Sequence, residues 1–93
     1  PKVFTVSQNF PNPFNPLTTL QYTIPDNAVV KITIFDNMGR LVKNLMDGYQ
    51  IAGRNTIQWN ATDNNGQDVS AGLYFYTLEA GSIIKTGKML LLK

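Results

Sequence analysis

Residues 56–78 read T-I-Q-W-N-A-T-D-N-N-G-Q-D-V-S-A-G-L-Y-F-Y-T-L and hold the single tryptophan and the densest aromatic run of the chain. Apolar and polar residues alternate up to Trp59, which is the period of a strand with one buried face. Residues 73–78 alternate in the same way and predict a second strand. The polar segment between the two strands predicts a hairpin loop with Asn65 and Gly66 at its turn.

The length and composition of the chain indicate one small globular domain. Ninety-three residues allow a single modest core, and a hydrophobic content of 43% argues against a disordered chain. Eight lysines and arginines face six acidic residues, and the basic residues are scattered along the chain. No basic cluster forms, so we expect no nucleic-acid partner. The chain has no histidine and no cysteine, which removes the usual catalytic bases, zinc ligands and disulfides, so we expect no enzyme activity and no cofactor.

The start of the sequence predicts a piece of a larger protein. The chain opens on Pro1 without a methionine or a charged leader, as expected for a domain separated from a longer chain. The final apolar run is four residues long, whereas a membrane-spanning helix needs about 20 apolar residues. We therefore expect no transmembrane segment.

Residues 7–16, S-Q-N-F-P-N-P-F-N-P, differ in kind from the rest of the chain. Their three prolines remove three backbone donors and fix three φ angles, so this segment does not suit a central strand. It predicts a stiff, extended segment on the surface, with Phe10 and Phe14 anchoring it to the core. We interpret residues 1–17 as a proline-rich lead-in to one domain that covers residues 1–93.

Alternating hydrophobicity predicts further strands over residues 19–24, 29–35 and 83–92, the last of them interrupted near Gly87. Residues 40–46 fit a helical stripe about as well as a strand, and their short length between two turns favours a strand. Asp47-Gly48 and Ala52-Gly53 bracket a predicted connection to the next strand. About seven strands, separated by frequent turn signals and without a convincing helix, predict an all-β, antiparallel, immunoglobulin-like β-sandwich.

The strand pattern also predicts which side chains form the core. Both faces of residues 73–78 are apolar, so we expect both faces to be covered. An alternative is an exposed aromatic platform for sugars, built from Tyr49, Trp59, Phe75 and the tyrosines at 74 and 76; a core role is favoured. The residues predicted to lie in the core are Tyr22, Ile32, Ile34, Trp59 and Tyr76.

The loop at residues 63–68 raises the question of a calcium site. Asp63, Asn65 and Asp68 supply oxygen ligands around Gly66 in a loose likeness to a calcium-binding loop. The loop lacks the downstream bidentate glutamate and the full spacing of such motifs. A polar loop between strands is favoured, and no metal is predicted.

Five segments, taken in order, resemble the type A C-terminal sorting domain of the type IX secretion system of certain Gram-negative bacteria. They also resemble the immunoglobulin-like domain of the flagellar hook-capping protein, a sequence relative of those sorting domains. The segments are S-Q-N-F-P-N-P-F-N-P, T-T-L-Q-Y-T-I-P, V-V-K-I-T-I-F-D-N-M-G-R-L-V, the run from Trp59 to Leu78, and the terminal K-M-L-L-L-K.

The resemblance implies a β-sandwich at the C-terminus of a large exported protein. The cargo, N-terminal to the domain, crosses the inner membrane by a signal peptide. An outer-membrane translocon then recognises the domain in the periplasm, and in many relatives a sortase removes it at the cell surface. The expected locations are the periplasm in transit and then the cell surface or the medium. In this interpretation the domain is a signal with no catalysis of its own.

The family motifs fall on both ends of the chain and on the start of the last-but-one strand. We expect a folded signal to be recognised through such segments. The predicted recognition residues are Pro11, Asn12, Pro13, Phe14, Asn15, Pro16, Gly72, Tyr74, Lys88 and Lys93. The alternatives are an immunoglobulin-like accessory module of a secreted enzyme, either a spacer or carbohydrate-binding, and a flagellar scaffold domain. A sandwich with a long terminal strand also permits a dimer by strand exchange.

Overall fold

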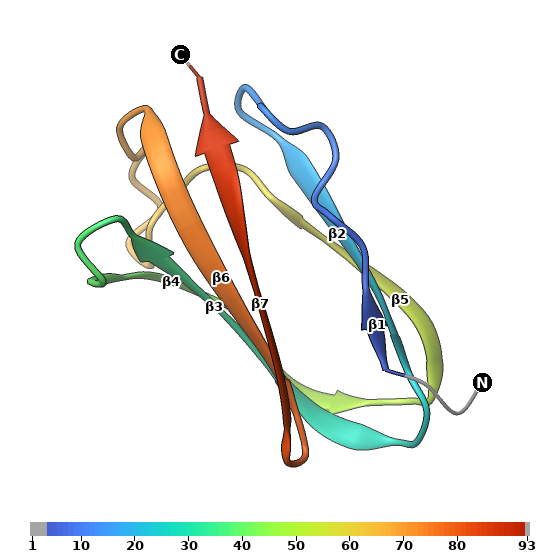
Figure 1. The fold of residues 1–93 in the computed structure, drawn as a ribbon. Helices are drawn as coiled ribbons and strands as arrows, with labels where there is room; N and C mark the ends of the chain where they lie inside the picture. Colours follow the sequence, from blue (N-terminus) through green and yellow to red (C-terminus); the bar gives the residue numbers. More distant parts are fainter. Residues whose placement is uncertain (1–3, 93) are drawn as a thin grey trace.

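The computed structural model describes residues 4–92, and within this range it contains seven β-strands and no helix (Figure 1). Lys93 and the first three residues lie outside the described part. The described residues accordingly contain no helix that is long and apolar enough to cross a membrane. The strands are β1 (Thr5–Val6), β2 (Thr18–Ile24), β3 (Ala28–Asp36), β4 (Leu41–Gln50), β5 (Gly53–Trp59), β6 (Gly72–Ala80) and β7 (Ile83–Leu91).

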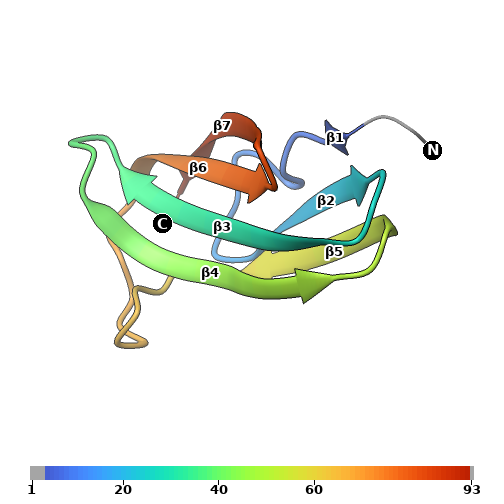
Figure 2. The same cartoon turned by 90° about the horizontal axis from the view of Figure 1, so that it is seen from below.

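The strands form two antiparallel sheets that pack face to face, which confirms the predicted immunoglobulin-like sandwich (Figures 1 and 2). One sheet has the order β1-β2-β5 and the other has the order β4-β3-β6-β7. Strands β5 and β6 therefore lie in different sheets, so the predicted hairpin over residues 56–78 is wrong. Alternation reports which face of a strand is buried, and it does not report which strand lies beside it. Residues 60–71 cross between the sheets.

Strand β4 is longer than the sequence predicts. Asp47 and Gly48 pair with Lys31 and Val30 of β3, so the predicted start of the connection is wrong and the chain turns only after Gln50. An Asp-Gly pair favours a turn locally, but the ladder along most of β3 outweighs that preference. The pairing of β3 with β4 contains two register shifts, at Ile32/Thr33 and Ile34/Phe35.

The core lies between the inner faces of the two sheets. The five side chains predicted for it are all buried, and Tyr74 is buried with them. The alternating burial of β2 shows the expected period of two, with every second residue inside. The buried apolar residues also include Phe4, Phe14, Leu20, Ile24, Val30, Ala61, Leu78, Ala80, Met89 and Leu91.

The outer face of β6 remains open to solvent. Leu73 and Phe75 keep 37% and 38% of their surface exposed, so the expectation that both faces of this strand are covered is wrong. Each sheet has only one packed face in a two-layer sandwich, and within residues 4–92 nothing buries the second face of β6. Strand β7 continues through Gly87, and the interruption predicted there is also wrong. A Cβ at Gly87 would overlap the ring of Tyr76, which lies opposite it on β6.

Burial of two tyrosines predicts a loss of stability at high pH. Burial raises the pKa of Tyr22 and of Tyr76 above the ordinary value of 10.0. The folded state favours the neutral phenol. The contribution of these two tyrosines to folding stability is therefore fully present below a pH of about 10 and is lost as the pH rises through the folded pKa. We expect Tyr76→Phe to unfold with a weaker pH dependence than the parent chain between neutral and alkaline pH, measured by urea denaturation. Equal pH dependence in both proteins would contradict this expectation.

Candidate functional site

Two motif segments that lie at opposite ends of the sequence meet at one end of the sandwich. Phe14 bridges Leu91 in parallel: its N–H donates to the carbonyl of Leu90 (3.0 Å), and the N–H of Leu92 donates to the Phe14 carbonyl (2.9 Å). Gly72, which starts β6, lies opposite Leu91 on the other side of β7. The segment before β2 and the end of β7 accordingly lie side by side in Figure 1. Three of the segments predicted to carry recognition therefore form one structural unit.

The segment before β2 covers one half of the free edge of β7. The N–H of Leu90 donates to Asn12 Oδ1 (3.0 Å), and Gln8 Nε2 donates to the carbonyl of Lys88 (2.9 Å). A proline has no N–H, so residues 11–16 cannot form a regular ladder with β7. Side-chain amides and the backbone of Phe14 make the contacts instead. This covering protects an edge that would otherwise be open to another strand.

An aromatic row fixes this end of the domain to the core. Phe14 is 2% exposed, and its ring centroid lies 5.7 Å from that of Trp59. Trp59 in turn makes an edge contact with Tyr74 at 5.4 Å. Trp59 Nε1 donates to the carbonyl of Thr62 (2.9 Å), and the Tyr74 hydroxyl donates to the carbonyl of Ser70 (2.6 Å). Buried rings with satisfied polar groups stabilise the fold, so Phe14 and Tyr74 hold the surface in place from beneath.

Phe10 was predicted to be a second anchor, and this prediction is wrong because its side chain is 78% exposed. Only its backbone is held, through two hydrogen bonds of 2.9 Å with Thr19. The buried residue at this turn is Asn9, whose Nδ2 donates to Thr18 Oγ1 (2.9 Å), while Thr18 Oγ1 donates to the carbonyl of Pro11 (2.8 Å). Neither of these two polar residues was predicted to be buried. Thr18 lies two residues before Leu20 and therefore on the same, inward face of the strand, which could have indicated its burial. Nothing in the sequence distinguishes Asn9.

The remaining motif residues form the outside of this unit, which we call the motif end. Gly72 has a φ of 147°, a conformation that favours glycine, and pairs with β7. Lys93 lies outside the described residues. The exposed residues of the motif end are Pro11, Asn12, Pro13, Asn15, Pro16, Leu17, Lys88, Leu90 and Leu92. Three prolines, three leucines, two asparagines and one lysine therefore make up this surface, and the proline rings restrict its backbone.

The loop that suggested calcium has a structural role. Asp63 Oδ1 accepts hydrogen bonds from the N–H groups of Asn65 (2.9 Å) and Gln67 (3.0 Å), so this carboxylate closes the loop. Asn64 pairs with the free edge of β4: its N–H donates to the carbonyl of Val42 (3.1 Å), and its Oδ1 accepts from the N–H of Asn44 (2.9 Å). In residues 4–92, no three Asp, Glu, His or Cys side chains gather where they would hold a metal ion. The loop covers a sheet edge.

The aromatic platform is not assembled. Trp59, Tyr74 and Tyr76 are buried in the core, whereas Tyr49 and Phe75 are exposed, Tyr49 to 64%. Three of the five rings are therefore closed to a sugar. The structure places these aromatic residues mainly as packing groups.

The sequence model of a family described as "FlgD Ig-like domain" matches residues 16–82, well over half of the chain. The chain belongs to this family. The match begins at the end of the proline segment and stops before β7, so the two terminal motifs lie outside it. No curated protein sequence matches the chain.

Two solved structures from Porphyromonas gingivalis share the fold of this FlgD Ig-like domain. The first is dimeric latent PorU, with a TM-score of 0.75 and 23% identity over 99% of this chain and 9% of that chain. The second is PorZ, described as an essential surface component of the type IX secretion system, with a TM-score of 0.60 and 19% identity over 97% of this chain and 11% of that chain. At these identities the likeness concerns the fold, and the chain corresponds to a small part of either protein.

Proposed function

We propose that the domain is a sorting signal of the type IX secretion system, which directs a larger exported protein across the outer membrane to the cell surface. Membership of the FlgD Ig-like family and a fold shared with parts of PorU and PorZ support this proposal. The domain acts by being recognised and has no catalysis of its own. Its partners are the outer-membrane translocon, a sortase, and the cargo that precedes it on the same chain. It passes through the periplasm and reaches the cell surface or the medium.

The observation that carries the proposal is the convergence of the motifs at one end of the sandwich. Phe14 and Leu90, far apart in sequence, are joined by a backbone hydrogen bond, and Asn12 adds a second link to the same strand. The surface is complete only in the folded chain, so a translocon that binds it detects folding of the domain as well as its presence. Prolines also lower the conformational entropy that a loop loses on binding.

A fusion experiment tests this function. A passenger enzyme with a periplasmic leader is joined to residues 1–93 in a bacterium that has the type IX system, and its activity is measured at the surface of intact cells. We expect surface activity with the domain and periplasmic retention without it. The triple variant Asn15→Ala, Lys88→Ala and Leu92→Ser changes exposed side chains of the motif end. We expect it to reduce surface activity by about tenfold or more, as for loss of about 1.4 kcal/mol of binding free energy.

The matched control changes an amide, a cation and an aliphatic side chain elsewhere: Gln58→Ala, Arg54→Ala and Ile51→Ser, all exposed. It should be exported like the parent domain. Both triple variants must keep the parent thermal midpoint, so that export reports recognition. Truncation before Lys88 is a poor test, because it removes the buried Met89 and Leu91 from the core. Equal export of the two triple variants would contradict a role of the motif end.

The family match favours a second candidate, a scaffold domain like that of the flagellar hook cap. The matched range stops before β7, whereas the superposition on PorU covers 99% of the chain, including the motif end. The terminal motifs therefore favour the sorting signal. Restored hook assembly when this domain replaces the corresponding part of a hook-capping protein, together with failed passenger export, would favour the scaffold.

A further inference from the structure

In the part of the chain that the structure describes, no strand pairs with the second half of the free edge of β7. Strand β7 is an edge strand, and the backbone groups of Leu90 and Leu92 face its free side, where they bond to the proline segment. Because backbone groups alternate in direction along a strand, those of Ile84 and Thr86 face the same side. Among residues 4–92, no hydrogen bond reaches that side of these two residues. Two sets of donors and acceptors are therefore available to another strand.

A lysine on the inner face of this part of β7 disfavours pairing with the β7 edge of a second copy of the chain. Lys85 lies opposite the buried Leu78 on β6, so it occupies the inner face, and its side chain is nevertheless exposed. Strand β7 carries Lys85 and Lys88 and no acidic residue. Inward-facing charges on edge strands discourage pairing between identical edges. In the described part of the chain the single ion pair is Arg40–Asp36, so no described carboxylate neutralises Lys85.

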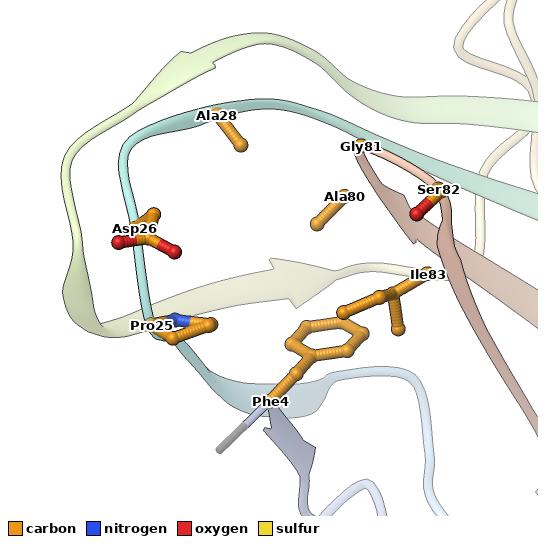
Figure 3. Close-up of a pocket in the computed structure, with 8 residues that line it drawn as sticks. All are labelled: Phe4, Pro25, Asp26, Ala28, Ala80, Gly81, Ser82 and Ile83. Carbon is orange, nitrogen blue, oxygen red and sulfur yellow. The ribbon is translucent and has the colours of Figure 1, made fainter. Parts of the chain in front are cut away.

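An apolar pocket lies next to the same edge, one inward position away from Lys85. Its volume is about 230 Å³, and Phe4 and Ile83 line one side of it, with the Ile83 side chain directed toward the Phe4 ring (Figure 3). Pro25, Ala28 and Ala80 complete its apolar lining, with Asp26 at the β2–β3 turn. Sites for drug-sized ligands measure roughly 300–1,000 Å³. The pocket is smaller and suits one large apolar side chain.

We propose that the open half of β7 is a strand-addition site for an extended segment of a partner protein that carries an acidic residue two positions from a large apolar residue. In such a strand, alternate side chains face inward, so the carboxylate lies beside Lys85 while the apolar side chain enters the pocket beside Ile83. The backbone of Ile84 and Thr86 supplies the ladder. The site lies apart from the motif end and does not depend on the proposed sorting function.

The probe is a blocked heptapeptide, Thr-Leu-Thr-Glu-Thr-Leu-Thr, whose central acid has a leucine two positions away in either strand direction. It is titrated into the 93-residue chain labelled with ¹⁵N, and backbone amide signals are followed by NMR. We expect peptide-dependent shifts at Ile84 and Thr86, and hydrogen exchange of these two amides slowed about tenfold at saturation.

Two variants make the test specific. Thr86→Pro removes one edge donor at a position where a folded sheet tolerates proline, and should abolish binding. Lys85→Glu should weaken binding of the acidic peptide about tenfold or more and favour the same peptide with lysine in place of its glutamate. Arg54→Glu makes the same change of charge on an exposed position of β5 and should leave both affinities unchanged.

Several results would overturn the proposal. One is the absence of shifts at Ile84 and Thr86 at millimolar peptide, and another is shifts confined to other strands. Equal affinity of the acidic and basic peptides for the parent chain would contradict the proposed pairing of Lys85 with an acidic residue of the partner. Concentration-dependent self-association through these same amides, without peptide, would identify a second copy of the chain as the occupant in place of a partner.

Discussion

Replacement of Trp59 by alanine is expected to bring the domain close to unfolding. The ring is almost fully buried, contacts Phe14 and Tyr74, and donates through Nε1 to the carbonyl of Thr62. Truncation of a buried tryptophan costs about 3–5 kcal/mol, whereas a small domain has roughly 5–15 kcal/mol of stability in total. The loss is therefore a large part of the stability of the whole domain.

Urea denaturation followed by circular dichroism measures this loss without relying on tryptophan fluorescence. Ile51→Ala is the control, because this side chain is exposed, and it should change the free energy of unfolding by less than about 0.5 kcal/mol. A loss below about 1 kcal/mol for Trp59→Ala would mean that the ring is not the centre of the core.

Phe14→Ala should have the second largest effect, and Phe10→Ala should have almost none. The two phenylalanines lie four residues apart in the same proline-rich segment, but Phe14 is buried against Trp59 and Phe10 projects into solvent. We expect Phe14→Ala to lower the free energy of unfolding by about 3–5 kcal/mol and Phe10→Ala by less than about 0.5 kcal/mol.

Loss of the Phe14 ring should also release the proline segment from β7. The N–H of Leu92 donates to the Phe14 carbonyl, so its hydrogen exchange should accelerate more than that of strand amides in β3, which pair on both sides. The same comparison with Phe10→Ala should show no difference. Equal destabilisation by the two substitutions, or uniform acceleration across the domain, would contradict an anchoring role that is specific to Phe14.

The structure divides the motif residues into two groups with different roles. Phe14 and Tyr74 are buried in the aromatic row and stabilise the motif end from within, whereas Asn15 and Lys88 are exposed on its surface. Substitution in the first group should reduce export by unfolding the domain. Substitution in the second group should reduce it with stability unchanged. Export and thermal midpoint, measured together on the same variants, therefore separate a stability effect from loss of recognition.

The candidate site was only partly predictable from the sequence. The residues of its motifs were predicted from a resemblance to a family of sorting domains. Their contact with one another was not predicted, because Asn12 and Leu90 are joined only through tertiary pairing. Asn9 has no local signal, since a polar residue before a phenylalanine and a proline is typical of a surface turn. Its burial depends on Thr18 and the carbonyl of Pro11, which close around it in the fold.

The sequence by itself determined the class of the fold and the core residues of several strands. An alternation of two along β2, β3 and β6 places Tyr22, Ile32 and Tyr76 on a buried face whatever strands lie beside them, because this period is a property of the strand. Tertiary structure alone decided strand order, the passage of β4 through Asp47 and Gly48, and the choice of Phe14 over Phe10 as anchor. These features depend on which surfaces meet across the sandwich, and local preferences of a fraction of a kcal/mol do not specify that.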